Sequence, residues 1–144
     1  MTLPIPIPNT ILSSLVLIVD DADFSLHRLQ ATLRKYGFNN VVCAEDGQEA
    51  LEFIEKSTPQ MVITDWIMQR MDGYALCKYI RSKEGLKHLP ILIQTGSDIP
   101  REFFRMFEAG ATDMIRKPTP PEALISKIVA YLEAQQMVVR HKNE

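Results

Sequence analysis

The stretch Leu15-Val16-Leu17-Ile18-Val19-Asp20-Asp21 is an apolar run that ends in two adjacent acids, and Met61-Val62-Ile63-Thr64-Asp65 repeats the pattern with one acid. Runs that are apolar at successive positions, without alternation, are typical of parallel strands buried on both faces. The carboxyl ends of neighbouring parallel strands meet at one edge of an open α/β sheet, where ligands bind. If these two strands are neighbours, the three acids lie together at that edge.

Carboxylates gathered in this way repel one another, by roughly 4 kcal/mol for a pair 4 Å apart at an effective dielectric constant of about 20. A hard divalent cation relieves that repulsion. Mg²⁺ prefers one or two carboxylates together with water and phosphate oxygens. Asp20, Asp21 and Asp65 therefore predict a Mg²⁺ site for phosphate chemistry.

The composition is that of a single globular domain of 144 residues with one core. A net charge of −2, from 16 basic and 18 acidic residues, gives no general attraction to nucleic acid or to an anionic membrane. Cys43 and Cys77 have no metal-ligand spacing, so a reducing cytoplasm is the expected location. No apolar stretch approaches the roughly 20 residues that span a bilayer. We expect neither direct nucleic-acid binding nor membrane insertion.

Short apolar runs alternate with helical patterns along the chain, which predicts βα units around a parallel sheet. Strands are expected at residues 15–19, 41–44, 61–64, 91–95 and 113–116, with the second and fifth as edge candidates. Helices are expected over about 24–36, after an Asp46 cap, after an Asp72 cap, from Asp98 to about Gly110, and from Thr119 as N-cap.

Right-handed crossovers leave few ways to order five strands. We choose the order 2-1-3-4-5, because it places the first and third strands side by side as the acid cluster requires. The choice therefore depends in part on the acids themselves. The expected fold is a doubly wound, flavodoxin-like three-layer α/β sandwich around a five-stranded parallel sheet.

Two further polar residues fall at the same sheet edge. Thr95 ends the fourth expected strand, and Lys117 follows the fifth. A hydroxyl and a compact cation are suitable neighbours for a phosphoryl group carried on an aspartate. The chemistry indicated is attack by an Asp65 carboxylate oxygen on phosphorus, with the metal and the lysine neutralising charge.

These motifs together resemble the signature of the receiver domain of two-component response regulators, with a fold similar to that of chemotaxis response regulators. The resemblance covers about residues 14–136 and is carried by Asp20-Asp21, Asp65-Trp66-Ile67-Met68-Gln69-Arg70-Met71-Asp72-Gly73, Thr95-Gly96 and Lys117-Pro118. Each motif alone is weak, whereas all of them in order at receiver spacing are highly specific.

The resemblance implies a signalling domain that accepts a phosphoryl group from a histidine kinase or phosphotransfer protein and switches a partner or effector interaction. Its own chemistry would be limited to self-phosphotransfer and self-dephosphorylation, so it is not an enzyme in the usual sense. It implies Asp65 as phosphoacceptor, Thr95 and Lys117 as phosphoryl contacts, a cis peptide before Pro118, and Mg²⁺ held by Asp20, Asp21, Asp65 and the backbone carbonyl of Ile67.

Four residues depart from, or vary within, the family's pattern. Gln69 replaces a usual proline, which predicts a looser loop beside the metal site. Met114 replaces the switch aromatic three residues before the lysine, so aromatic rotation is not available to this chain. Ile67 and Ser97 occupy positions that set the phosphoryl lifetime. Because an apolar Ile67 cannot position the attacking water, we expect slow self-dephosphorylation.

Residues 103–107 carry more apolar surface than one buried helix face can use, in Phe103, Phe104, Met106 and Phe107. One reading folds all four under neighbouring loops. The other exposes part of this surface as a partner or homodimer face made by the fourth helix, fifth strand and fifth helix, with Met114 in the same face.

The sequence also predicts the form of the two ends of the chain. Residues 1–13, with prolines at 4, 6 and 8, predict an extended N-terminal arm, followed by a receiver domain over 14–136. Residues 137–144 are a C-terminal tail or the start of a linker. We favour a linker to an effector domain, while a stand-alone receiver stays open.

Three other interpretations of these residues compete with the receiver. Asp20 or Asp21 could simply cap the first helix, and a cap is the preferred role for Asp72. A metal-dependent phosphohydrolase with an aspartate nucleophile is the alternative function, but the haloacid dehalogenase type needs an acid where this chain has Ile67. A flavodoxin-like FMN module needs a phosphate-cradling loop where the chain has Asp20-Asp21-Ala22-Asp23.

Overall fold

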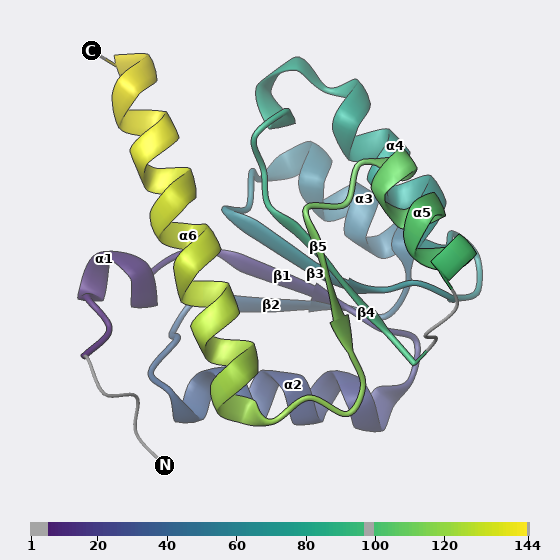
Figure 1. The fold of residues 1–144 in the computed structure, drawn as a ribbon, viewed down its shortest axis with the longest axis horizontal. Coiled ribbons are helices and arrows are strands. Elements are labelled where there is room, and N and C mark those ends of the chain that lie inside the picture. Colours follow the sequence, from purple (N-terminus) through teal and green to yellow (C-terminus); the bar gives the residue numbers. More distant parts are fainter. Residues whose placement is uncertain (1–5, 97–99, 144) are drawn as a thin grey trace.

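The computed structural model describes residues 6–96 and 100–143. Five parallel strands form one sheet in the order β2-β1-β3-β4-β5 (Figure 1). The strands are β1 (Val16–Val19), β2 (Val41–Ala44), β3 (Met61–Asp65), β4 (Ile91–Thr95) and β5 (Asp113–Arg116). The predicted fold class, strand order and edge strands are confirmed.

Helices cover both faces of the sheet and make the three layers visible in Figure 1. One face carries α2 and α6, and the other carries α3, α4 and α5. The helices are α1 (Asn9–Leu12), α2 (Asp23–Lys35), α3 (Gly47–Lys56), α4 (Gly73–Ser82), the short 3₁₀ helix η1 (Glu84–Leu86), α5 (Pro100–Ala109) and α6 (Pro121–Asn143). In the described ranges, no helix is long and apolar enough to cross a membrane.

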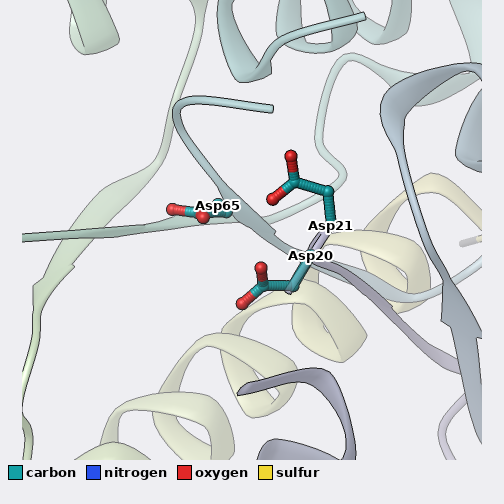
Figure 2. Close-up of side chains that lie close together, drawn as sticks. All are labelled: Asp20, Asp21 and Asp65. Carbon is teal, nitrogen blue, oxygen red and sulfur yellow. The ribbon is translucent and has the colours of Figure 1, made fainter. Parts of the chain in front are cut away.

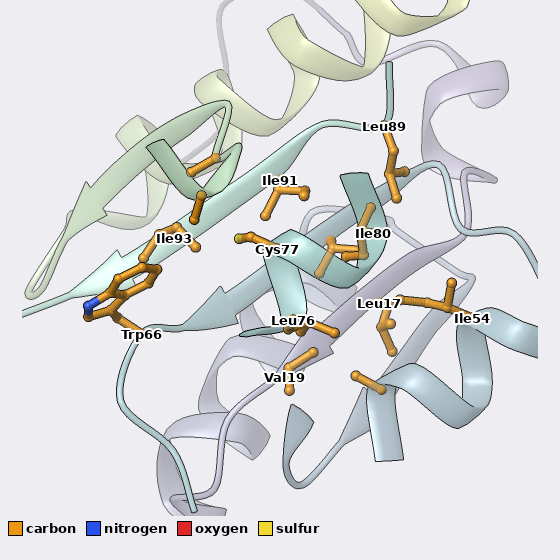
Figure 3. Close-up of a cluster of buried hydrophobic side chains, with 14 of the residues drawn as sticks. Leu17, Val19, Ile54, Trp66, Leu76, Cys77, Ile80, Leu89, Ile91 and Ile93 are labelled. Carbon is orange, nitrogen blue, oxygen red and sulfur yellow. The ribbon is translucent and has the colours of Figure 1, made fainter. Parts of the chain in front are cut away.

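The central strand β1 is buried on both faces, as its unbroken apolar run predicts. Leu17 and Val19 join the core under α3, α4 and α5, whereas Val16 and Ile18 join the core under α2 and α6. All four side chains are at most 1% exposed. Figure 3 shows the first of these cores, with Trp66 at one end and Leu89 at the other.

Two of the predicted caps are present. The Asp46 carboxylate accepts a hydrogen bond from the Glu49 N–H at the start of α3, and the Asp72 carboxylate accepts one from Ala75 at the start of α4. Capping by an acid satisfies a backbone donor that the helix itself leaves unpaired. Asp72 thus has the cap role that the sequence favoured.

The predicted N-cap of the last helix is wrong. The helix α6 begins at Pro121, and the Thr119 hydroxyl donates back to the Arg116 carbonyl. A threonine hydroxyl can bond to nearby backbone in a turn as readily as to a helix start. The Asp98 start of the fourth helix lies outside the described residues; α5 is described from Pro100.

Part of the expected N-terminal arm is helical. Residues Asn9–Leu12 form α1, and Ile11 is 1% exposed in the core under α2 and α6. The α6 residue Gln136 donates a side-chain hydrogen bond of 2.9 Å to the Thr10 carbonyl. Burial of Ile11 favours a compact turn over an extended arm. At the other terminus α6 continues through residue 143 without a break at 137.

The half-buried guanidinium of Arg81 ties the ends of α4 and α5 together, away from the acid cluster. It donates to the backbone carbonyls of Gly110 and Leu86, each at 2.9 Å. Gly110 has φ of 110°, and a Cβ placed on it would lie 2.5 Å from Arg81 Cγ. Both the left-handed backbone and the close approach therefore require glycine there.

Gly110→Ala is accordingly expected to lower the free energy of unfolding by about 1–3 kcal/mol, because a residue with a Cβ is strained at this φ. Gly85→Ala is the matched control, since a Cβ there has no neighbour within 4 Å. Urea denaturation of both variants measures the difference. An equal loss of unfolding free energy in Gly110→Ala and Gly85→Ala would contradict the requirement for glycine at position 110.

Helix α6 is fastened to β5 through Asp113. The Asp113 Oδ2 atom accepts from the Tyr131 hydroxyl at 2.7 Å and lies 3.0 Å from Lys127 Nζ. Burial acts to raise the pKa of Asp113, but the hydrogen bonds from Tyr131, Lys127 and the Met114 N–H outweigh it and hold that pKa below its usual value. The bond to Asp113 also raises the pKa of Tyr131 to about 12.

Tyr131→Phe should reduce stability by about 1 kcal/mol at neutral pH, the typical worth of one hydrogen bond. A carboxyl whose folded pKa is depressed stabilises the fold above its unfolded pKa, near 3.9, and loses that contribution as pH falls through the folded value. The difference in unfolding free energy between the parent protein and Tyr131→Phe should therefore shrink at acid pH. Denaturation at several pH values measures it, with Tyr36→Phe as control; a gap independent of pH would refute the role of Asp113.

Candidate functional site

Three carboxylates meet at the carboxyl edge of the sheet. Asp20 and Asp21 follow β1, Asp65 ends β3, and one carboxylate oxygen from each lies within 4.8 Å of the others (Figure 2). The parallel register, in which Val19 faces Thr64, brings the two strand ends level. The predicted convergence of these acids is confirmed.

Lys117 supplies positive charge to this cluster. Its Nζ atom lies 3.6 Å from Asp20 Oδ2 and 3.6 Å from Asp65 Oδ1. The Lys117-Pro118 peptide is cis, as the family resemblance implied. The Lys117 N–H donates to the carbonyl of Thr95, whose side chain is 4% exposed at the end of β4. The structure thus brings both predicted phosphoryl contacts to the edge that holds the acids.

The pKa of Asp65 is raised above its ordinary value. Burial is the largest cause, and the nearby Asp20 and Asp21 carboxylates act in the same direction. The ammonium of Lys117 and the N–H of Trp66, which donates to Asp65 Oδ1 at 2.9 Å, act against the rise. A carboxylate in this setting is favoured by added positive charge.

The oxygen ligands fit a hard cation. Carboxylates are preferred by Mg²⁺ and Ca²⁺ over the nitrogen and sulfur ligands that select zinc or copper. Asp20 is 2% exposed, and its Oδ1 accepts from the Ala22 N–H at 2.9 Å. Asp21 and Asp65 are more open. The Ile67 side chain is 80% exposed, and its carbonyl as a metal ligand stays a prediction.

The loop of residues 66–72, which joins β3 to α4, is held by contacts that sequence reasoning missed. The Gln69 N–H donates to Asp21 Oδ2 at 3.1 Å, and Arg70 Nε lies 3.2 Å from Asp46 Oδ2. Arg70 has a left-handed φ of 67°. The sequence carried one signal for the first contact, because a residue other than proline keeps its N–H.

Trp66 connects the acid cluster to α5. Its side chain is 7% exposed, and its ring N–H donates to Glu102 Oε2 at 3.1 Å. Tyr74 packs edge-on against the indole with ring centroids 6.1 Å apart, and Arg105 of α5 lies 4.6 Å from the Tyr74 ring centre. The residue after Asp65 is therefore tied to α5 by a direct bond and through Tyr74.

The aromatic surplus of α5 is partly exposed. Phe104 is 71% exposed and Phe107 53% exposed, whereas Met106 is buried and Phe103 packs half-buried on the core. The reading in which all four fold under neighbouring loops is wrong. Met114 is also half-buried, against the same core. A homodimer through this face stays a prediction.

Comparison with known proteins agrees with this geometry. Residues 16–129 match the family model described as the response regulator receiver domain. The chain is 38% identical to the chemotaxis protein CheY-3 of Vibrio cholerae over 113 residues. This aligned segment covers 78% of this chain and 87% of that protein. It is 30% identical to the alkaline phosphatase synthesis transcriptional regulatory protein PhoP of Bacillus subtilis, over 85% of this chain and 50% of that protein.

Solved structures show the same fold. A putative response regulator from Chloroflexus aurantiacus superposes with a TM-score of 0.79 at 37% identity, over 84% of this chain and 98% of that one. The chemotaxis protein CheY4 of Vibrio cholerae superposes with a TM-score of 0.76 at 32% identity, over 81% of this chain and 96% of that one. None of these matches supports the phosphohydrolase alternative. The acid cluster, the lysine beside it and the matched sequence agree, and the chain belongs to the response regulator receiver domain family.

Proposed function

We propose that Asp65 is the phosphoacceptor of a signalling switch, and that its donor is a phosphohistidine of a histidine kinase or phosphotransfer protein. The observation that carries the proposal is the setting of the Asp65 carboxylate, 3.6 Å from Lys117 Nζ and close to two further acids. One carboxylate oxygen would form a bond to phosphorus while the bond from phosphorus to the donor nitrogen breaks, and the nitrogen keeps the electron pair.

The other residues of the site each have a part. Asp20, Asp21 and Asp65, with the carbonyl of Ile67, would hold Mg²⁺, which when bound neutralises charge on the transferring group. Lys117 now balances Asp20 and Asp65 and can turn to a phosphoryl oxygen once Asp65 carries one. Thr95, at the end of β4, would offer its hydroxyl to another oxygen.

The product would remain on the protein as a covalent mark. A phosphoryl group adds a charge of about −1.5 to −2 beside the carboxylates, and its effect can reach α5 through Trp66 and Glu102, which are joined by a bond of 3.1 Å. The exposed Phe104 and Phe107 of α5 would then belong to the surface whose partner, or second copy, responds.

The proposal also covers the organisation of the chain. Residues 14–136 would form the receiver, and residues 137–144 would be a C-terminal tail or the start of a linker; α6 runs through residue 143 as a continuous helix. We place the protein in the cytoplasm, where Cys43 and Cys77, both free thiols in the structure, would stay reduced.

Acetyl phosphate with Mg²⁺ should add a single phosphoryl group, and Asp65→Asn should abolish the adduct because the amide is a poor nucleophile. Asp72→Asn is the matched control, since it changes an acid of the same loop that caps α4, and asparagine caps equally well. Intact mass with and without chelator measures the adduct. An adduct that persists in Asp65→Asn, or turnover of a phosphate ester without any adduct, would overturn the proposal.

The exposed Ile67 side chain should make the adduct long-lived, because it offers no hydrogen bond to an attacking water. Ile67→Asn supplies one and is expected to speed loss of the phosphoryl group by about tenfold or more. Ile67→Val is the control and should leave the rate unchanged. The decay of the adduct by mass after removal of acetyl phosphate gives both rates, and equal decay in all three proteins would contradict the assigned role.

A further inference from the structure

The hydrogen bond between Gln69 and Asp21 joins two loops that lie 48 residues apart in sequence. Its donor is the backbone N–H of Gln69, and its acceptor is Asp21 Oδ2, at 3.1 Å. A proline at this position, as receivers usually have, could not donate. The contact therefore exists because of the departure that the sequence shows at Gln69.

Asp21 differs from the other two acids in what surrounds it. Lys117 lies 3.6 Å from both Asp20 and Asp65 and offsets their charge. Asp21 is exposed, and its carboxylate is repelled by the two neighbours within 4.8 Å. With no restraint it would be driven towards solvent, and the Gln69 N–H opposes that movement.

The donor is itself held in position. Arg70, the next residue, pairs with Asp46 at 3.2 Å, and the Gly73 N–H donates to the Trp66 carbonyl at 2.8 Å across the loop. The Met71 N–H donates to the Gln69 carbonyl, also at 2.8 Å. A donor fixed on both sides can orient the carboxylate that accepts from it.

We propose that the Gln69 N–H, which donates to Asp21 Oδ2 at 3.1 Å, positions Asp21 for the cation. The inference rests on the proposed function. Donor and cation do not compete, because a carboxylate has about four lone-pair sites and the N–H uses one on Oδ2. The carboxylate is then already in place when Mg²⁺ arrives, which lowers the cost of ordering it.

The first test is a titration of Mg²⁺ alone, followed by the fluorescence of Trp66. Gln69→Ala keeps the N–H and should bind within about twofold of the parent, whereas Gln69→Pro removes it and should bind about tenfold more weakly, the lower end of the loss seen when an outer partner of a metal ligand is removed. Equal affinity of Gln69→Pro and the parent overturns the inference. Equal loss in Gln69→Ala and Gln69→Pro does so too, because it would assign the effect to the side chain.

The second test needs no variant of Gln69. In the metal-free protein, NMR hydrogen exchange should show the Gln69 amide protected, and Asp21→Ala should remove that protection while the Gly73 amide, bonded to Trp66, keeps its own. An unprotected Gln69 amide in the parent overturns the inference even if Gln69→Pro fails to fold. If the parent protein binds no Mg²⁺, the proposed function is contradicted instead. Failure of the proposed function is therefore distinguishable from failure of the inference about Gln69.

Discussion

The pairing of β1 with β3 is the constraint on which the rest of the molecule depends. The two strands pair in parallel with Val19 opposite Thr64, so their ends bring Asp20, Asp21 and Asp65 to one place. The fold thereby concentrates negative charge at one edge, at a free-energy cost that apolar burial elsewhere must offset. Lys117, whose Nζ lies 3.6 Å from Asp20 Oδ2 and from Asp65 Oδ1, lowers that cost without removing it. What remains is an attraction for a cation, which is the property the proposed chemistry needs.

The sequence predicted the parts of the structure that follow from local pattern. Short apolar runs between helical patterns located all five strands, and acids at helix starts located two of the helices, at Asp46 and Asp72. The sequence-based prediction was wrong where a polar group could bond to either of two nearby backbone groups. The Thr119 hydroxyl, for example, donates to the Arg116 carbonyl instead of capping α6. The prediction was also wrong at α1, because the burial of Ile11 depends on a surface that other elements build. Contacts between distant loops leave little trace in local pattern.

The route from the site to the surface also differs from what the motif alone suggests. Met114 stands where receivers carry their switch aromatic, and it is packed half-buried on the core under α5. The aromatic residue that does link the acids to α5 is Trp66, bonded to Glu102 and stacked edge-on with Tyr74. Trp66 also donates its backbone N–H to Asp65. Trp66 therefore contacts both the proposed phosphoacceptor and α5, the helix on which Phe104 is exposed. A change in charge at Asp65 would therefore act on α5 without any rotation at position 114.

Backbone donors complete the account of the acid cluster. Asp20 accepts from Ala22, Asp65 from Trp66 and Asp21 from Gln69, so each carboxylate is oriented by one main-chain N–H. The first two bonds span one or two residues and form whenever the strand ends correctly. The third spans 48 residues and forms only when the loops after β1 and β3 are both in place. The position of the Asp21 carboxylate thus depends on the packing of two loops. Of the three proposed metal ligands, it is the one most open to change by substitutions elsewhere in those loops.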